Sequence, residues 1–332
     1  MERPCVRVPR EAGERTRETL AAADLVDEAH EIVVDDGDIY LPVTDADAAE
    51  REGYDVVYRD VPTHDTQRTP ADLLGFDPSY ERLGDVAILD EDDPDRARRI
   101  ADAILDSDLP VRAVLDRASK VKGDLRVRDW TVLAAEDRDG RPPTELVHRE
   151  YGFDYLLDLS TVYFSPRLAT ERHRVTEQTA EDERAVDMFA GVGPFVIPMA
   201  ARGATVVGVD LNPTAIEFLR ENAHRNGVEE RVTAIQGDVR DVAADHADAA
   251  DRIVMNLPHS ADDFLDAAAT LAGDDCVLHY YDIQHEDDPF GPGERAIREA
   301  ATGYDVDVET RHVVRSYAPH ELNVCLDVRL SR

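Results

Sequence analysis

The chain has 332 residues and a formal net charge of −35, which arises from 72 acidic and 37 basic side chains. Its length suggests two or three domains, and a hydrophobic content of 42% is enough for a large core. No apolar run approaches the roughly 18 residues of a membrane span, and no apolar targeting segment opens the sequence, so we expect a cytoplasmic protein without membrane contact.

The first predicted domain, over residues 1–62, is a small α/β unit. The polar stretch 63–70 breaks the apolar pattern and is typical of a linker. The elements expected in this domain are a strand over 5–8, a helix over 11–29 and strands over 31–34, 38–43 and 54–58.

A second α/β domain is predicted over residues 71–166. Its helix begins at Asp93-Pro-Asp, where an acidic residue followed by proline is typical of a helix N-terminus. The remaining apolar runs are short and predict strands. The expected elements are a helix over 93–105 and strands over 85–89, 111–115, 144–149 and 155–159.

Strands and helices alternate through residues 167–332, which predicts a mostly parallel sheet with helices on both faces. Two closing strands would bring the sheet to seven strands and give it an antiparallel edge. The expected helices are 168–177, 193–201, 214–226, 260–271 and 294–301, and the strands begin near residues 185, 205, 232, 252, 276, 304 and 322.

The first strand-to-helix turn of this third domain reads Asp-Met-Phe-Ala-Gly-Val-Gly-Pro-Phe over 187–195. Gly191 and Gly193 would let the backbone turn sharply beside a helix N-terminus that can bind a carboxylate. Only two of the three glycines of the dinucleotide motif are present, which disfavours a nicotinamide cofactor. The run instead favours S-adenosylmethionine in a Rossmann-like class I methyltransferase domain.

Acidic residues follow the ends of successive strands, where such a sheet binds ligands. Asp187 would hold the amino end of the cofactor, Asp210 would accept its ribose hydroxyls, and Asp238 would lie near its adenine amine. The residues expected to bind the cofactor are Asp187, Phe189, Gly191, Gly193, Asp210, Asn212, Asp238 and Asn256.

Asn256 opens an Asn-Leu-Pro-His turn after the fourth strand. Methyltransferases acting on base nitrogens place an N/D-x-P-x turn there, whose amide can bond to a base edge. Amine methylases usually carry Asn-Pro-Pro and an aromatic residue, so Leu257 and His259 argue against an exocyclic amine as the acceptor. The alternative interpretation of Asn256 is a turn residue that caps the next helix.

Three segments together resemble the archaeal and eukaryotic tRNA (guanine-N1)-methyltransferases, which modify guanosine 37. They are the run Tyr-Phe-Ser-Pro-Arg-Leu-Ala-Thr-Glu-Arg from Tyr163, the glycine turn and Asn-Leu-Pro-His. The resemblance covers nearly the whole chain, including Lys-Val-Lys-Gly-Asp-Leu-Arg from Lys120. The sister family, the aminocarboxypropyl transferases of wyosine synthesis, shares much of this pattern but lacks the Asn, so Asn256 favours methylation.

The resemblance implies catalytic roles for four residues. Glu171 matches the proposed general base, which would remove the N1 proton of guanine. Arg126 matches the arginine that stabilises the charge developing on O6, although Arg128, two positions on, is a rival. Tyr163 would position the flipped base and Asn256 would fix its edge. A surface position is the alternative for Glu171.

The expected RNA contacts are Lys120, Lys122, Arg128 and Arg167. Lys120 and Lys122 are the only lysines, and abundant acid with scarce lysine is typical of a halophilic archaeon. In molar salt the Debye length falls to about 3 Å, so the acidic charge does not exclude tRNA. The resemblance implies that the first domain reads the outer corner of tRNA, and that the enzyme is a monomer that also contacts the anticodon loop.

The three cysteines are far apart and form no C-x-x-C pair, so we expect no metal site and no structural disulfide. Two alternatives to guanosine methylation use the same cofactor: aminocarboxypropyl transfer and methylation of a wyosine precursor. A tRNA-binding protein with a degenerate cofactor pocket is a third, which the intact set of acidic and glycine positions disfavours.

Overall fold

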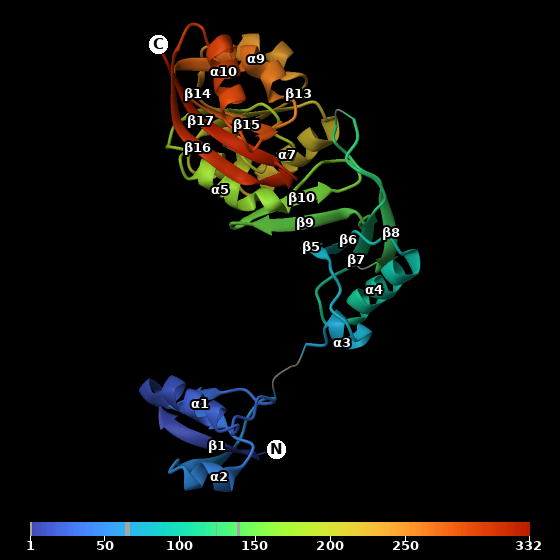
Figure 1. Ribbon diagram of the computed structural model, residues 1–332, viewed down its shortest axis with the longest axis vertical. Coiled ribbons are helices and arrows are strands. Elements are labelled where there is room, and N and C mark those ends of the chain that lie inside the picture. The colour runs from blue at the N-terminus through green and yellow to red at the C-terminus, as the bar shows by residue number, and fades with distance from the viewer. Residues whose placement is uncertain (1, 64–66, 124, 138–139) are drawn as a thin grey trace. The chain divides into compact units, whose positions relative to one another are not determined.

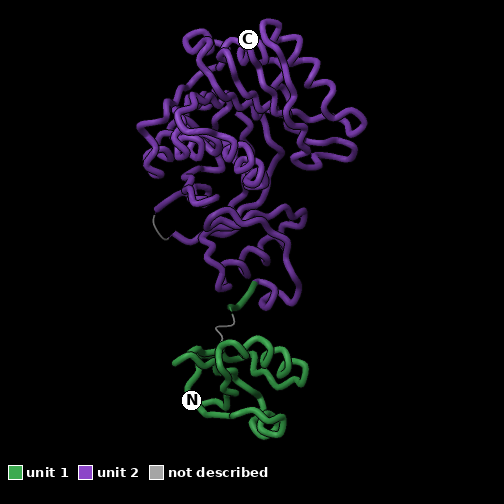
Figure 2. Tube along the Cα trace, turned by 90° about the vertical axis from the view of Figure 1, so that its left-hand side faces the viewer, with its two compact units in different colours: residues 1–69 green, residues 70–332 purple. Residues whose placement is uncertain are grey.

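The computed structural model describes residues 2–63, 67–123, 125–137 and 140–332. The chain forms two compact units, Met1–Thr69 and Pro70–Arg332, which Figure 2 colours separately. The predicted linker contains residues 64–66, which lie outside the described part. None of the described helices is long and apolar enough to cross a membrane.

The first unit is an antiparallel sheet with strand order β2-β3-β1-β4 and two short helices, α1 and α2. Val6 and Leu41 of the sheet pack with Leu20 of α1 and Ala49 of α2 in one small core. The elements are β1 (Glu2–Pro9), α1 (Gly13–Ala22), β2 (Val33–Asp35), β3 (Asp38–Pro42), α2 (Ala46–Arg51) and β4 (Val56–Asp60).

The helix expected over 11–29 is shorter than predicted, because α1 ends at Ala22. Asp24 adopts a left-handed conformation with φ of 56°, and the N–H of Leu25 then bonds to the carbonyl of Leu20 at 2.9 Å. This is a Schellman motif, which terminates a helix. Glycine usually marks that position, so an aspartate there gave no clear signal in the sequence.

The second unit begins with a four-stranded sheet in the order β5-β6-β7-β8, covered by α4. Asp93 caps α4 by accepting hydrogen bonds from the N–H groups of Asp95 and Arg96, as its sequence predicted. The edge strand β8 was not predicted. The elements are α3 (Pro70–Leu74), β5 (Glu81–Leu83), β6 (Val86–Leu89), α4 (Pro94–Asp106), β7 (Ala113–Arg117) and β8 (Trp130–Ala135).

A separate hairpin, β9 (Glu145–Glu150) with β10 (Phe153–Asp158), follows this sheet and packs on α7 (Pro213–Arg225). The amide of Asn222 accepts from the N–H of Leu156 at 2.7 Å and donates to its carbonyl at 3.1 Å. Asn226 bonds in the same way to both backbone groups of Asp154. The two asparagines therefore fix the hairpin to the helix.

The large sheet has seven strands in the order β13-β12-β11-β14-β15-β17-β16. The first five are parallel, which confirms the predicted mostly parallel sheet. The two closing strands, β16 and β17, form one edge of the sheet, where β17 runs antiparallel to both β15 and β16. The strands are β11 (Arg184–Asp187), β12 (Thr205–Asp210), β13 (Val232–Gln236), β14 (Ala250–Met255), β15 (Ala272–His285), β16 (Asp305–Ala318) and β17 (Glu321–Ser331).

Helices cover both faces of this sheet, so each central strand is buried on both sides. Figure 1 shows α5 and α7 on one side and α9 and α10 on the other. Two separate clusters of buried apolar side chains lie on these faces. The helices are α5 (Ala169–Thr176), α6 (Val196–Ala201), α7, α8 (Val239–Val242), α9 (Leu265–Leu271) and α10 (Gly291–Ala300).

Candidate active site

A cavity of about 680 Å³ opens at the carboxyl ends of β11, β12, β13 and β14. This is the edge at which parallel sheets of this kind bind ligands. Residues 188–191, 210–212, 237–240, 256–257 and 259–260 line it from the four strand ends. The opposite wall comes from outside the large sheet, from Gly123, Leu125 and Arg126 and from residues 163–165.

The two glycines of the first turn have different surroundings. Gly191 has φ of 52° and lines the cavity, and a Cβ atom there would meet nothing within 4 Å. Gly193 has φ of 95° and faces α7, where a Cβ atom would lie 2.5 Å from Leu219. Gly191 therefore leaves the cavity open, whereas Gly193 allows the helices to pack closely.

Asp187 ends β11 and is only 1% exposed, just behind the cavity wall. Its Oδ1 accepts a hydrogen bond from the N–H of Phe189 at 3.1 Å, but its buried Oδ2 has no partner among the described residues. Burial raises the pKa of Asp187 to about 7. A buried carboxylate oxygen without a partner, next to the cavity wall, has the chemistry to hold a cation such as the ammonium group of S-adenosylmethionine.

Asp210 ends β12 and links two parts of the cavity wall. Its carboxylate accepts from the N–H of Gly191 at 2.7 Å and from the N–H of Asn212 at 2.9 Å. Burial raises its pKa as well. A carboxylate has further lone pairs, so ribose hydroxyls can still donate to it.

Asn212 and Asp238 line the cavity and also cap helices. Asn212 accepts from the N–H of Thr214 at the start of α7, and its amide donates to the carbonyl of Thr161 at 2.8 Å. Asp238 caps α8 and pairs with Arg240 at 2.5 Å. Both side chains are therefore fixed before any ligand binds.

Three of the predicted catalytic residues line the cavity: Arg126 and Tyr163 on the opposite wall, and Asn256 at the end of β14. Within the described part of the chain their side chains make no hydrogen bond. Arg126 lies in the turn between the bridged residues Lys122 and Val127, and its φ of 55° is uncommon for a residue other than glycine. The guanidinium, the phenol and the amide are thus available to a ligand.

Glu171, the fourth predicted catalytic residue, does not line this cavity. Its side chain is 4% exposed, and its carboxylate forms two 2.8 Å hydrogen bonds with Arg174. The hydroxyl of Tyr281 donates to it at 2.8 Å, and Nε2 of His312 lies 3.2 Å away. Its neighbours Leu168 and Arg172 do line the cavity, so Glu171 lies behind the wall.

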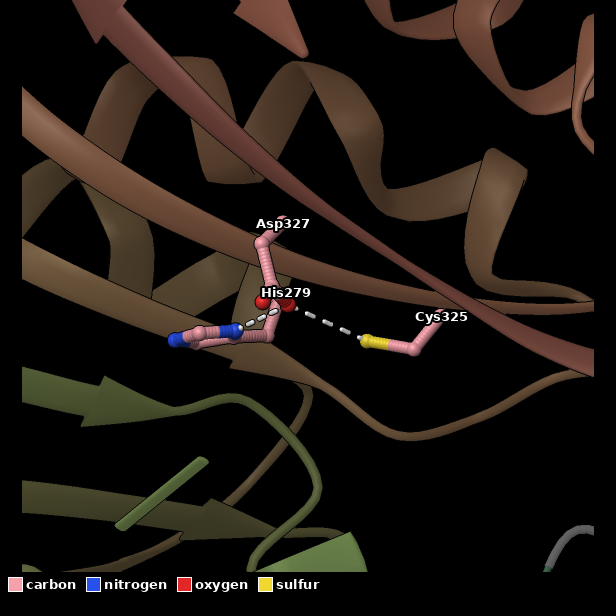
Figure 3. A group of neighbouring side chains, drawn as sticks. All are labelled: His279, Cys325 and Asp327. Atoms are coloured by element: carbon pink, nitrogen blue, oxygen red, sulfur yellow. Dashed lines mark hydrogen bonds and ion pairs between the residues drawn. The ribbon is translucent and has the colours of Figure 1, made fainter. Parts of the chain in front are cut away.

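The bonds of Arg174 continue into a buried polar network around Asp327 (Figure 3). Asp327 accepts from Arg174 at 2.6 Å and contacts Nδ1 of His279 at 2.7 Å, and Cys325 lies beside it. Burial alone would raise the pKa of Asp327, but the bonds to His279 and Arg174 hold it well below its usual range. Arg252 contacts His279 from the other side at 2.6 Å. Two guanidinium charges argue against a metal cation in this cluster.

Of the four predicted RNA-contacting residues, Arg128 and Arg167 line a common second cavity, whereas Lys120 and Lys122 do not. Lys120 is exposed, and Lys122 forms an ion pair with Asp129. Arg167 pairs with Glu81 at 3.4 Å, whereas Arg128 stacks over the ring of Trp130 at 5.5 Å.

Some lining residues were missed by the sequence analysis. Phe264 packs edge-on against Phe189 with ring centroids 5.0 Å apart. His259, which was considered only as a departure from the Asn-Pro-Pro pattern, bonds to the hydroxyl of Tyr317 at 3.0 Å. Tyr317 lies 58 residues further along the chain, so no local signal connects the two.

Three family models match the chain in consecutive segments. The model of the TRM5/TYW2 methyltransferase domain matches residues 146–309. The model of the tRNA methyltransferase 5 N-terminal domain matches residues 5–50, and that of the TYW2 N-terminal domain matches residues 66–138.

Relatives whose names state an activity match this chain over most of its length. The chain is 37% identical to tRNA (guanine(37)-N(1))-methyltransferase Trm5b of Pyrococcus abyssi, over 98% of both chains. It is 34% identical to a tRNA(Phe) (4-demethylwyosine(37)-C(7)) aminocarboxypropyltransferase of Pyrococcus horikoshii, over 80% of this chain and 94% of that one. A solved complex of aTrm5 with tRNALeu superposes with a TM-score of 0.73 at 30% identity, covering 98% of this chain and 99% of that one.

Proposed function

The chain belongs to the TRM5/TYW2 methyltransferase family, and we propose that it is a tRNA (guanine(37)-N1)-methyltransferase that uses S-adenosylmethionine. One observation carries the proposal: the carboxylates of Asp187 and Asp210 lie at or just behind the wall of one cavity, which is also lined by Arg126, Tyr163 and Asn256, whose side chains make no hydrogen bond within the described residues. The relative named as this methyltransferase also matches both units of the chain.

The cofactor supplies an electrophilic methyl group on a sulfonium. Asp187 and Asp210 hold its amino end and its ribose, and Asp238 and Phe189 border the adenine. On the acceptor side, Tyr163 stacks on the flipped guanine, Asn256 bonds to its edge and Arg126 stabilises the charge on O6 as N1 loses its proton. Holding both reactants in one cavity supplies much of the rate acceleration.

We propose Glu171 as the base that receives the N1 proton. In this role its carboxylate exchanges its bonds to Arg174 and Tyr281 for the guanine when RNA binds. Hydrogen bonds of catalytic groups often form only in the complex with substrate, so the resting position behind the wall is compatible with the role.

The test is incubation with labelled S-adenosylmethionine and tRNA transcripts that carry either G37 or A37. Nucleoside analysis should find one methyl group on N1 of G37 and no product on A37. The aminocarboxypropyl transferase alternative, favoured by the relative at 34% identity, predicts a heavier product on a demethylwyosine-containing tRNA. Product mass distinguishes the two, and label on a wyosine precursor would identify the third activity.

We propose further that the enzyme acts as a monomer in the cytoplasm of a halophile, with three modules over 1–62, 71–166 and 167–332. The first module would read the outer corner of tRNA, and the other two would hold the anticodon loop. Sedimentation with tRNA at molar KCl tests the stoichiometry. Deletion of residues 1–62 should raise the KM for tRNA while leaving cofactor affinity unchanged.

A further inference from the structure

A second cavity, of about 290 Å³, adjoins the first and shares Arg126 and Tyr163 with it. Its walls come from the β5-β6-β7-β8 sheet, from the segment around residues 163–167 and from β16. Five arginines line it: Arg117, Arg126, Arg128, Arg167 and Arg315. In a chain with 72 acidic and 37 basic residues, this is a local excess of positive charge.

The arginines of this second cavity differ in their partners. Arg117 pairs with Glu81 at 2.6 Å and with Asp90 at 3.1 Å, and Arg167 shares Glu81. Within the described residues, Arg126, Arg128 and Arg315 have no ion pair with a carboxylate. Three guanidinium groups without an ion-pair partner among the described residues therefore line the cavity, together with the carboxylates of Glu81 and Asp90.

Two of these groups are also partly removed from water. The Nε atom of Arg315 is buried and has no hydrogen-bond partner in the described part of the chain. Burial, together with the nearby charge of Arg117, lowers the pKa of Arg128. A buried donor without an acceptor costs free energy, which a bound anion would recover.

We propose that the second cavity binds one backbone phosphate of the RNA, within a nucleotide or two of the base held in the first cavity. The inference rests on the proposed function, because the shared wall of Arg126 and Tyr163 places the anion beside the flipped base. Guanidinium groups match phosphate oxygens through paired N–H donors, which a single ammonium cannot do.

The site also suits molar salt. Exposed phosphate contacts weaken steeply as salt rises, whereas partly buried ion pairs are screened much less. Arg315 and Arg128 therefore provide charge recognition that persists when contacts from exposed residues such as Lys120 have lost most of their effect.

The experiment measures binding of the full chain to a tRNA ligated from synthetic halves, in which one phosphate near G37 at a time is a neutral methylphosphonate. At about 2 M KCl, a methylphosphonate at one of these positions should weaken binding to the wild type by about tenfold or more. A loss of this size is usual when a hydrogen bond to a charged group is removed. Arg315→Ala should weaken binding of unmodified tRNA similarly. In this variant, the same methylphosphonate should cause no further loss of tRNA affinity.

Arg311→Ala is the matched control, since Arg311 lies on the same strand and pairs with Glu294 outside the cavity. It should keep the full methylphosphonate effect. Affinity for S-adenosylhomocysteine, measured on every variant, verifies that the fold is intact. If Arg315→Ala does not fold, Arg128→Ala replaces it, with the same loss of coupling expected.

The proposal is overturned if no phosphate position couples to Arg315 or Arg128, even when methyl transfer to G37 is normal. It is also overturned if the methylphosphonate effect persists undiminished in both variants. A wild type that shows the coupling but methylates no G37 transcript would instead contradict the proposed function and leave the phosphate site standing.

Discussion

On the cofactor side of the main cavity, Asp187 is buried, Asp210 is partly buried, and backbone N–H groups fix both carboxylates. On the acceptor side, Arg126 and Asn256 are partly exposed, Tyr163 is 42% exposed, and none of the three side chains has a hydrogen-bond partner within the described residues. One side is thus preorganised by the sheet, whereas the proposed function has the substrate complete the other. The two sides should respond differently to mutation: the acceptor side in turnover, and the cofactor side in cofactor affinity.

The largest effect should come from Glu171→Gln, which keeps the shape of the side chain but removes the base. Single-turnover methyl transfer should fall by about 10²–10⁴-fold, and the remaining rate should rise with pH as guanine loses its proton without help. Cofactor affinity should not change. Glu177→Gln, at the exposed end of the same helix, is the control. Normal turnover of the Glu171→Gln variant would remove Glu171 as the base.

Arg126→Ala should lower the rate of methyl transfer by about 10²–10³-fold, because the charge on O6 loses its stabilising partner. Calorimetry should show unchanged binding of S-adenosylhomocysteine. Arg126→Lys should recover part of the rate, since the charge returns without the planar fork. A weakened cofactor affinity would show that the two sides are not separable in this way.

Asp210→Asn should lower cofactor affinity rather than the rate of methyl transfer, the reverse of what is expected for Arg126→Ala. It removes the charged acceptor for ribose hydroxyls and weakens the bonds that fix Gly191, so cofactor affinity should fall by about 10- to 100-fold. At saturating cofactor the rate should stay near that of the wild type. Asp241→Asn, an exposed carboxylate on α8, should change neither quantity.

The smallest effect concerns pH. The pKa of Asp187 is about 7 in the fold, above the usual value near 4, so the unfolded chain loses this proton first. Between about pH 4 and pH 7 rising pH therefore destabilises the free protein through this group, and the penalty is fully present above pH 7. The cofactor ammonium favours the ionised form, so affinity should rise by about tenfold from pH 6 to pH 8. Asp187→Asn should abolish this dependence, and an unchanged pH profile would contradict the assignment.

The contrast between the cofactor side and the acceptor side of the cavity also explains which features could be predicted from the sequence. The parallel strands, the glycine turn and the carboxylates after each strand are local patterns, and the structure places them together at one edge of the sheet. The surroundings of Glu171 depend on Tyr281 and His312, which lie 110 and more residues away, so no periodicity could reveal them. Arg126 depends on a left-handed turn at a residue other than glycine, which also carries no clear signal.

The asparagines of α7 have a consequence for solubility. A two-stranded hairpin leaves rows of free N–H and C=O groups, to which another chain can add as a strand. Asn222 and Asn226 occupy those groups at Leu156 and Asp154, so a helix supplies the bonds that an intruding strand would otherwise make. At high salt, where charge repulsion between molecules is short-ranged, this blocking of edge-to-edge aggregation by geometry would keep its effect.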